Sequence, residues 1–449
     1  MTLEMHSLHL LHEAVAHLDA GFADLPALHA ELDMTALRGV LLEAAERMRD
    51  NYPYPHPLYA GQMLKPPHPV ARLAYALSLW INPNNHALDG GRASSAMEKE
   101  AVAELAGMFG WANHLGHLCG GGTMANLEAL WVAGRLRPGQ KIVASQQAHY
   151  THSRISEVLQ LPYAAVPCNA NAQMDLAALE AMLQAGDIGT VVATLGATAT
   201  GAVDPLPGLL ELQATYGFRI HADAAYGGYY TLVENLRPET AAAYACLDRV
   251  DSLVIDPHKH GLQPYGCGCV LFRDPAVGAL YKHDSPYTYF SSAELHLGEI
   301  SLECSRAGAS AVALWATQRL LPPVRGGAFA GMLAQCREAA LILADKISRD
   351  ERWMLAFDPE LDIVVWAERG TAASEISRRS RAIFEAAAAQ DLHLAVATFP
   401  AALLAERWPD VVWDQPTVAC LRSCLMKAEH RDWVDEIWAR LARAAAEIG

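Results

Sequence analysis

The chain is poor in charged residues, and the charges that it does carry are unbalanced. Asp, Glu, Lys and Arg make up 19% of its 449 residues, whereas hydrophobic residues make up 52%. Such a composition at this length indicates a globular protein with a large buried surface and more than one domain. The formal net charge is −16 at pH 7. We therefore expect neither nucleic acid nor an anionic membrane as a partner, because both attract basic proteins.

Long apolar runs are missing too. No stretch of 18 or more apolar residues occurs, so no membrane-spanning helix is predicted. Residues 1–21 carry acids and histidines instead of a basic start and an apolar block, and so do not read as a secretory signal. These features predict a cytoplasmic protein.

Recognisable metal-binding patterns are absent from the sequence. The nine cysteines are odd in number, and neither Cys267 and Cys269 nor Cys420 and Cys424 have the doubled CxxC spacing of a zinc site. The 19 histidines include no HExxH pair. We expect no metal, and we interpret the cysteines as buried thiols of a reducing compartment.

Short apolar runs alternate with helical stretches between residues 115 and 275. This alternation predicts an α/β domain whose mainly parallel sheet is covered by helices on both faces, with ligands bound after the strand carboxyl ends. The expected strands are 141–145, 190–196, 218–225, 252–256 and 268–272.

Breaks in this alternation of strands and helices predict three parts of the chain. Residues 1–85 combine a helical arm with a Pro-rich extended segment, residues 86–325 form the large domain, and Pro322 and Pro323 mark its end. Strand candidates at 361–368 and 417–426 then predict a small C-terminal α/β domain over 326–449.

Four segments that follow or end expected strands carry candidate chemistry. Gly121, Gly122 and Thr123 open a helix, where free backbone N–H groups suit a phosphate. Their spacing matches neither GxGxxG nor GxxxxGK[ST], which excludes the Rossmann and Walker patterns. Asp223 ends an apolar strand and needs a cationic or donating partner.

A lysine and a histidine complete this set. Lys259 lies between two histidines, and His149 follows the strand at 141–145. Each residue alone also has a structural interpretation: a glycine turn, a helix cap, a solvated lysine or a buried histidine. Together they favour pyridoxal 5′-phosphate, which needs a phosphate cradle, an acid for its pyridine nitrogen and a lysine for its aldehyde.

The chain resembles the pyridoxal-phosphate-dependent amino-acid decarboxylases of group II, which include aromatic-L-amino-acid, glutamate and diaminobutyrate decarboxylases. The resemblance covers nearly the whole chain, in order. It rests on "PHPLYAGQM" (55–63), "CGGGTMANLEAL" (119–130), "GATATGAVDPL" (196–206), "HADAAYGG" (221–228), "DPHKHGLQPYGCGCVLFRD" (256–274), "CSRAGASAVALWATQRLL" (304–321) and "LRSCLM" (421–426).

This resemblance implies a role for each matching residue. Lys259 forms the internal aldimine and Asp223 pairs with the pyridinium nitrogen, while His149 and Ala225 pack on the two faces of the ring. Arg422 matches an arginine that contacts the substrate carboxylate in some members. The residues implied around the phosphate and the ring substituents are Gly121, Gly122, Thr123, His258 and Thr198.

The implied architecture is the aspartate-aminotransferase type, called fold type I, with the active site at a homodimer interface. The N-terminal part would then pack on the partner subunit. Tyr287 and Tyr289 are both candidates for the tyrosine that returns a proton to the substrate carbon. Two departures are Asp256, where an Asn or Ser is common, and His260, where a bulky apolar residue is common.

The activity implied is α-decarboxylation of an L-amino acid to its amine and carbon dioxide, through the Lys259 internal aldimine and a quinonoid intermediate. An alternative on the same fold is a different pyridoxal-phosphate-dependent carbon–carbon lyase or a decarboxylating aldehyde synthase. A third hypothesis is a non-enzymatic relative, which the presence of Lys259, Asp223 and His149 disfavours. The sequence leaves the identity of the amino acid open.

Overall fold

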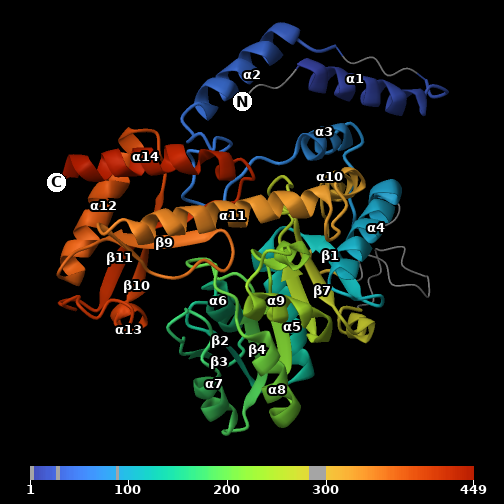
Figure 1. Ribbon diagram of the computed structural model, residues 1–449. Helices are drawn as coiled ribbons and strands as arrows, with labels where there is room; N and C mark the ends of the chain where they lie inside the picture. The colour runs from blue at the N-terminus through green and yellow to red at the C-terminus, as the bar shows by residue number, and fades with distance from the viewer. Residues whose placement is uncertain (1–4, 27–30, 87–89, 283–299, 449) are drawn as a thin grey trace.

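Two β-sheets organise the computed structural model, which describes residues 5–26, 31–86, 90–282 and 300–448 (Figure 1). The larger sheet has seven strands in the order β1-β7-β6-β5-β4-β2-β3. All run parallel except β7, which is antiparallel to β6 and β1. The strands are β1 (Leu115–Cys119), β2 (Lys141–Ser145), β3 (Tyr163–Val166), β4 (Ile188–Thr194), β5 (Arg219–Asp223), β6 (Ser252–Ile255) and β7 (Gly268–Phe272).

The predicted mainly parallel sheet is confirmed, and all five expected strands are present. The bounds of β2 and β7 coincide with the apolar runs 141–145 and 268–272. Two strands lay outside the prediction: β1 contains a glycine and a histidine, and β3 is a four-residue strand at the sheet edge. Neither has the continuous β-branched run that identifies a buried strand in sequence.

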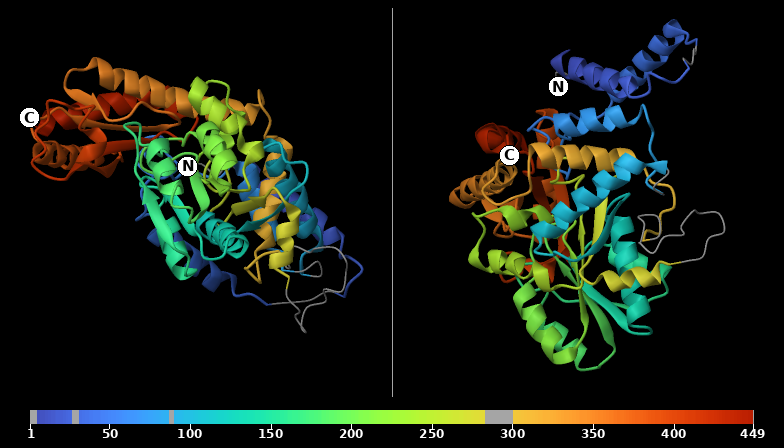
Figure 2. Two further views of the ribbon diagram at one scale, coloured as in Figure 1. Left: turned by 90° about the horizontal axis from the view of Figure 1, so that it is seen from below. Right: turned by 90° about the vertical axis from the view of Figure 1, so that its right-hand side faces the viewer.

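Helices cover both faces of the large sheet (Figure 2). Helix α5 packs across β4 to β7, α8 packs against β5, and α4 packs against β1 and α10. Their bounds and those of the neighbouring helices are α4 (Arg92–Met108), α5 (Gly122–Leu136), α6 (Thr151–Val158), α7 (Leu176–Leu183), α8 (Leu206–Tyr216), α9 (Pro238–Ala245) and α10 (Gly308–Leu320), with 3-10 turns η2 (Gly228–Leu232), η3 (Leu247–Arg249) and η4 (Pro275–Leu280).

A second, smaller sheet lies in the C-terminal part of the chain. Its four antiparallel strands follow the order β10-β11-β9-β8, and the two strand candidates of the sequence correspond to β9 and β11. The long helix α11 extends from this sheet towards the large one (Figure 1). The elements are β8 (Trp353–Leu355), β9 (Ile363–Glu368), β10 (Ala395–Pro400), β11 (Thr417–Cys424), α11 (Ala328–Arg349), α12 (Ala373–Ala389), α13 (Ala401–Leu404) and α14 (His430–Ile448).

The N-terminal helices α1 (Met5–Ala20) and α2 (Met34–Met48) stand apart from both sheets, whereas α3 (Pro69–Ser78) packs on α10 (Figure 1). Helix α2 has no buried residue, and three of its hydrophobic side chains, Leu37, Val40 and Leu41, are exposed on one face. Among the described residues, no helix combines the length and the apolarity needed to cross a membrane.

Residues 57–65, here called the strap, bind the C-terminal sheet of the same chain. The N–H of Ala60 donates to the carbonyl of His393 at 2.9 Å, and the Ala60 carbonyl accepts from the N–H of Cys424 at 2.6 Å. At Gly61 a Cβ atom would lie 2.2 Å from the backbone carbon of Leu394, so only glycine allows this approach.

Candidate active site

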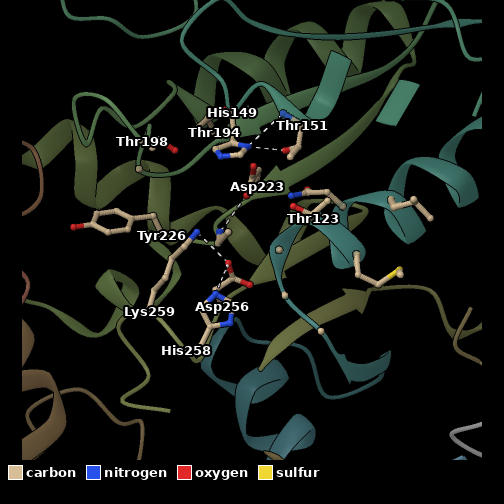
Figure 3. Close-up of a pocket in the computed structure, with 18 residues that line it drawn as sticks. Thr123, His149, Thr151, Thr194, Thr198, Asp223, Tyr226, Asp256, His258 and Lys259 are labelled. Atoms are coloured by element: carbon tan, nitrogen blue, oxygen red, sulfur yellow. Dashed lines mark hydrogen bonds and ion pairs between the residues drawn. The ribbon is translucent and has the colours of Figure 1, made fainter. Parts of the chain in front are cut away.

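A cavity of about 480 Å³ opens at the carboxyl ends of the parallel strands (Figure 3). Segments after β1, β2, β4 and β6 line it together with the end of β5. All nine residues predicted to hold a cofactor are in this lining: Gly121, Gly122, Thr123, His149, Thr198, Asp223, Ala225, His258 and Lys259.

The glycine segment leaves the start of α5 open for an anion. Gly121 is the N-cap of α5, has a φ of 148° and provides no side-chain cap. A Cβ atom at Gly121 would lie 3.1 Å from the His258 ring, and one at Gly122 would lie 2.7 Å from Oδ2 of Asp256. Side chains at either position would fill the space in which the uncapped N–H groups and the helix dipole attract a phosphate.

Asp223 is held as an anion at the floor of the cavity. Its side chain is buried, its Oδ1 accepts from the N–H of Ala225 at 3.2 Å, and its Oδ2 accepts from Nε2 of His152 at 2.8 Å. Burial alone would raise the pKa of Asp223, but the His152 hydrogen bond and charge, with Lys259 nearby, hold that pKa below its ordinary value. A buried anion of this kind suits a protonated ring nitrogen.

His152 is the residue of this set that the sequence analysis missed. It lies in the first turn of α6, and its side chain is fully buried beneath Asp223. The sequence offered one signal, a second histidine three residues after His149 in "HYTH". Nothing in the sequence indicates whether His149 or His152 points at Asp223, because the turn before α6 sets the direction of both side chains.

We expect His152→Leu to weaken cofactor binding about 10- to 100-fold, because a hydrogen bond to a buried charge contributes roughly 1.5–3 kcal/mol. Loss of that bond raises the pKa of Asp223, so the acid limb of the activity profile should move to higher pH. His152→Gln, which keeps a donor, should restore part of both effects. Equal profiles for the Leu variant and the unmodified protein, measured by cofactor titration and initial rates, would exclude this positioning role.

Lys259 enters the cavity from the loop after β6. Its Nζ lies 3.0 Å from Oδ2 of Asp256, and 21% of its side chain is exposed (Figure 3). His258 lies on the other side of the same carboxylate, 3.5 Å from Oδ2. Burial lowers the pKa of His258 in spite of Asp256, so its ring is neutral near pH 7.

His149 forms another wall of the cavity. Its Nδ1 hydrogen-bonds the Thr151 hydroxyl at 2.8 Å, and burial lowers its pKa, so this ring is also neutral near pH 7. None of the described residues hydrogen-bonds Nε2 of His149. That nitrogen is therefore free to interact with a bound molecule.

Arg422 lies in an adjoining cavity of about 360 Å³, which shares His149 and Thr198 with the first one. Its guanidinium donates to the carbonyls of Thr198 at 2.6 Å, Gly61 at 3.0 Å and Ala199 at 3.2 Å, and 5% of the residue is exposed. The described structure therefore uses Arg422 to join the large domain, the strap and β11. Tyr287 and Tyr289 lie outside the described residues.

His260 points away from the cavity, although it follows Lys259 in the chain. Its buried ring packs edge-on against Tyr226 and Tyr230 and lies 3.3 Å from Oδ2 of Asp362. Tyr226 lines the cavity and donates to Oδ1 of Asp362 at 2.6 Å. Within the described residues, no group of three or more His, Cys, Asp or Glu side chains is placed to hold a metal.

Known proteins share sequence and fold with this chain. The model of the pyridoxal-dependent decarboxylase conserved domain matches residues 69–368. The L-tyrosine decarboxylase of Levilactobacillus brevis is 26% identical, over 64% of this chain and 62% of its own length. The L-aspartate decarboxylase of Thermococcus kodakarensis is 28% identical, over 72% of this chain and 83% of its own. The chain thus spans less than two thirds of the first of these relatives.

Solved structures extend the likeness to the whole fold. Oryza sativa TDC with PLP and tryptamine aligns with a TM-score of 0.79 at 17% identity, covering 100% of this chain and 99% of that one. Mouse CSAD aligns with a TM-score of 0.77 at 18% identity, covering 96% and 92%. At these identities the structural likeness supports the fold alone, and it confirms the predicted fold type.

Proposed function

Because the chain belongs to the pyridoxal-dependent decarboxylase family, we propose that it removes the α-carboxyl group of an L-amino acid as carbon dioxide and releases the corresponding amine. The observation that carries this proposal is the single cavity that joins an anionic Asp223, the amine of Lys259 and the uncapped start of α5. The residues fit pyridoxal 5′-phosphate, whose protonated ring accepts the electron pair left on the substrate when the carboxyl group departs.

Each wall of the cavity has a separate task in this proposal. Asp223 keeps the proton on the ring nitrogen, and His152 keeps Asp223 charged. Lys259 would supply the amine that holds the cofactor through its aldehyde until a substrate amine takes its place. Gly121, Gly122, Thr123 and His258 surround the phosphate, while Ala225 and Thr198 border the ring.

Replacement of the carboxyl group requires a proton at the substrate carbon. We propose Nε2 of His149, Tyr287 or Tyr289 as its source; the two tyrosines lie outside the described residues. Arg422 is proposed to contact the substrate carboxylate. Three of its five N–H groups donate to backbone carbonyls, which leaves two for the substrate.

The test is incubation of the purified protein, with added cofactor, with each common L-amino acid and with diaminobutyrate. Relatives named for tyrosine and aspartate make these two substrates the first to try. Equal amounts of amine and carbon dioxide support the proposal. Release of ammonia and hydrogen peroxide would instead identify a decarboxylating aldehyde synthase, and carbon–carbon cleavage without carbon dioxide would identify another lyase.

We further propose that the protein works as a homodimer in which α2 packs on the partner subunit. The exposed residues Leu37, Val40 and Leu41 support this, because an apolar helix face of this kind needs a covering surface. The double variant Val40→Glu/Leu41→Glu should sediment as a monomer, whereas Arg38→Glu on the same helix should remain dimeric. A dimer that survives the double substitution argues against this interface.

A further inference from the structure

Asp256 places a buried carboxylate inside the proposed phosphate cradle. Only 2% of the residue is exposed, and its Oδ2 lies 2.7 Å from the Cβ that Gly122 would carry at the start of α5. Its Oδ1 lies 3.0 Å from the corresponding Cβ position of Gly268 and has no hydrogen-bond partner among the described residues. A bound phosphate and this carboxylate would therefore be two anions side by side.

Few charged side chains lie near Asp256 among the described residues. Lys259 and His258 come from its own loop, at 3.0 and 3.5 Å from Oδ2. Other titratable groups that face it are His149, the phenols of Tyr229 and Tyr265, and the thiols of Cys119, Cys267 and Cys269. Burial raises the pKa of these phenols and thiols and lowers that of His149, so all are neutral near pH 7. Within the described part of the chain, Lys259 is thus the one cation that offsets the carboxylate.

Cofactor binding adds negative charge beside Asp256 without adding a cation there. When the ammonium of Lys259 condenses with the aldehyde, a C–N bond forms, and two of its protons leave with the carbonyl oxygen as water. The third proton stays on Nζ of Lys259, so the condensation neither takes up nor releases protons, and Nζ keeps its single positive charge. Besides that charge and neutral His258, Asp256 then faces a phosphate that carries about −1.5 to −2 charges.

We propose that Asp256 and His258 act as a proton-binding pair that takes up about one proton when the cofactor binds, which makes cofactor affinity fall as pH rises. This proposal rests on the proposed cofactor site. The added proton makes the pair cationic at His258 or neutral at Asp256, and either state removes the repulsion between the carboxylate and the phosphate.

Calorimetric titration of the cofactor-free protein with pyridoxal 5′-phosphate, in buffers of different ionisation enthalpy, counts the protons taken up. Asp256→Asn should take up about one proton fewer at about pH 8 and bind the cofactor roughly 10-fold tighter there, since one linked proton changes affinity tenfold per pH unit. Glu303→Gln removes one charge beside the same glycines, where Glu303 accepts from the N–H of Gly120, and should behave like the unmodified protein.

Equal proton counts for Asp256→Asn and the unmodified protein, or weaker binding by the variant at every pH, would overturn the proposal. If the variant fails to fold, the unmodified protein alone tests the proposal. A cofactor affinity that does not fall between about pH 7 and 9 contradicts proton uptake. Absence of any cofactor binding would refute the proposed function itself, whereas binding without proton uptake would refute only the role of Asp256.

Discussion

Lys259→Ala should lose at least about 10³-fold in decarboxylation rate, the largest effect expected of a single substitution, because the amine that binds the cofactor disappears. The variant should also lack the absorbance near about 420 nm that a lysine-bound cofactor gives. Reduction of the unmodified protein with borohydride should fix the cofactor to the peptide that contains Lys259, and mass spectrometry of the variant should find no such peptide.

Lys141→Ala is the matched control, since Lys141 begins β2 of the same sheet and pairs with Asp187 at the surface. Its rate and spectrum should equal those of the unmodified protein. An active Lys259 variant with the covalent linkage on another residue would refute the assignment, because no other lysine reaches the cavity within the described part of the chain.

Asp223→Asn should reduce the rate by about 10²- to 10³-fold, as the loss of a pre-placed charge does in other active sites. A neutral amide cannot keep the ring nitrogen protonated, so the ring becomes a weaker electron acceptor. The covalent linkage through Lys259 should survive, and this separates the two variants: the first loses the cofactor bond, the second keeps it and loses the chemistry.

Asp251→Asn serves as the comparison, because this carboxylate lies at the opposite, amino end of β6 and accepts from the N–H of Ile220. Its kcat should change little. If Asp223→Asn kept its full rate while Asp251→Asn lost it, Asp223 could not be the partner of the ring nitrogen.

Much of this site could be predicted from sequence because strand ends converge. Asp223 and Lys259 end or follow predicted strands of one mainly parallel sheet, so the pattern of strands places them together without any knowledge of tertiary contacts; the strand before Gly121 was not predicted. The mainly parallel sheet followed from the alternation of strands and helices, whereas the fold type followed from the resemblance to the family. These predictions depended on local sequence and on topology, which periodicity and the family motifs report.

Contacts made by side chains were harder to predict. His152 supports Asp223 only because the turn before α6 directs it inward, and Asp256 faces the start of α5 only because Gly122 and Gly268 leave room for it. Arg422 carried a family role, but its donors meet three carbonyls that come from distant segments. Such pairings depend on packing, which the periodicity of one sequence does not encode.

The strap also constrains the order in which the chain can fold. Ala60 bonds to His393 and Cys424, so the strap has to wait for partners that are synthesised much later than itself. The large sheet, whose strands lie between residues 115 and 272, can pair long before those partners are synthesised. Contacts between segments so far apart in sequence form slowly. Docking of the strap on the C-terminal sheet is therefore a later step than pairing of the large sheet, whose cavity is lined by residues 120–259.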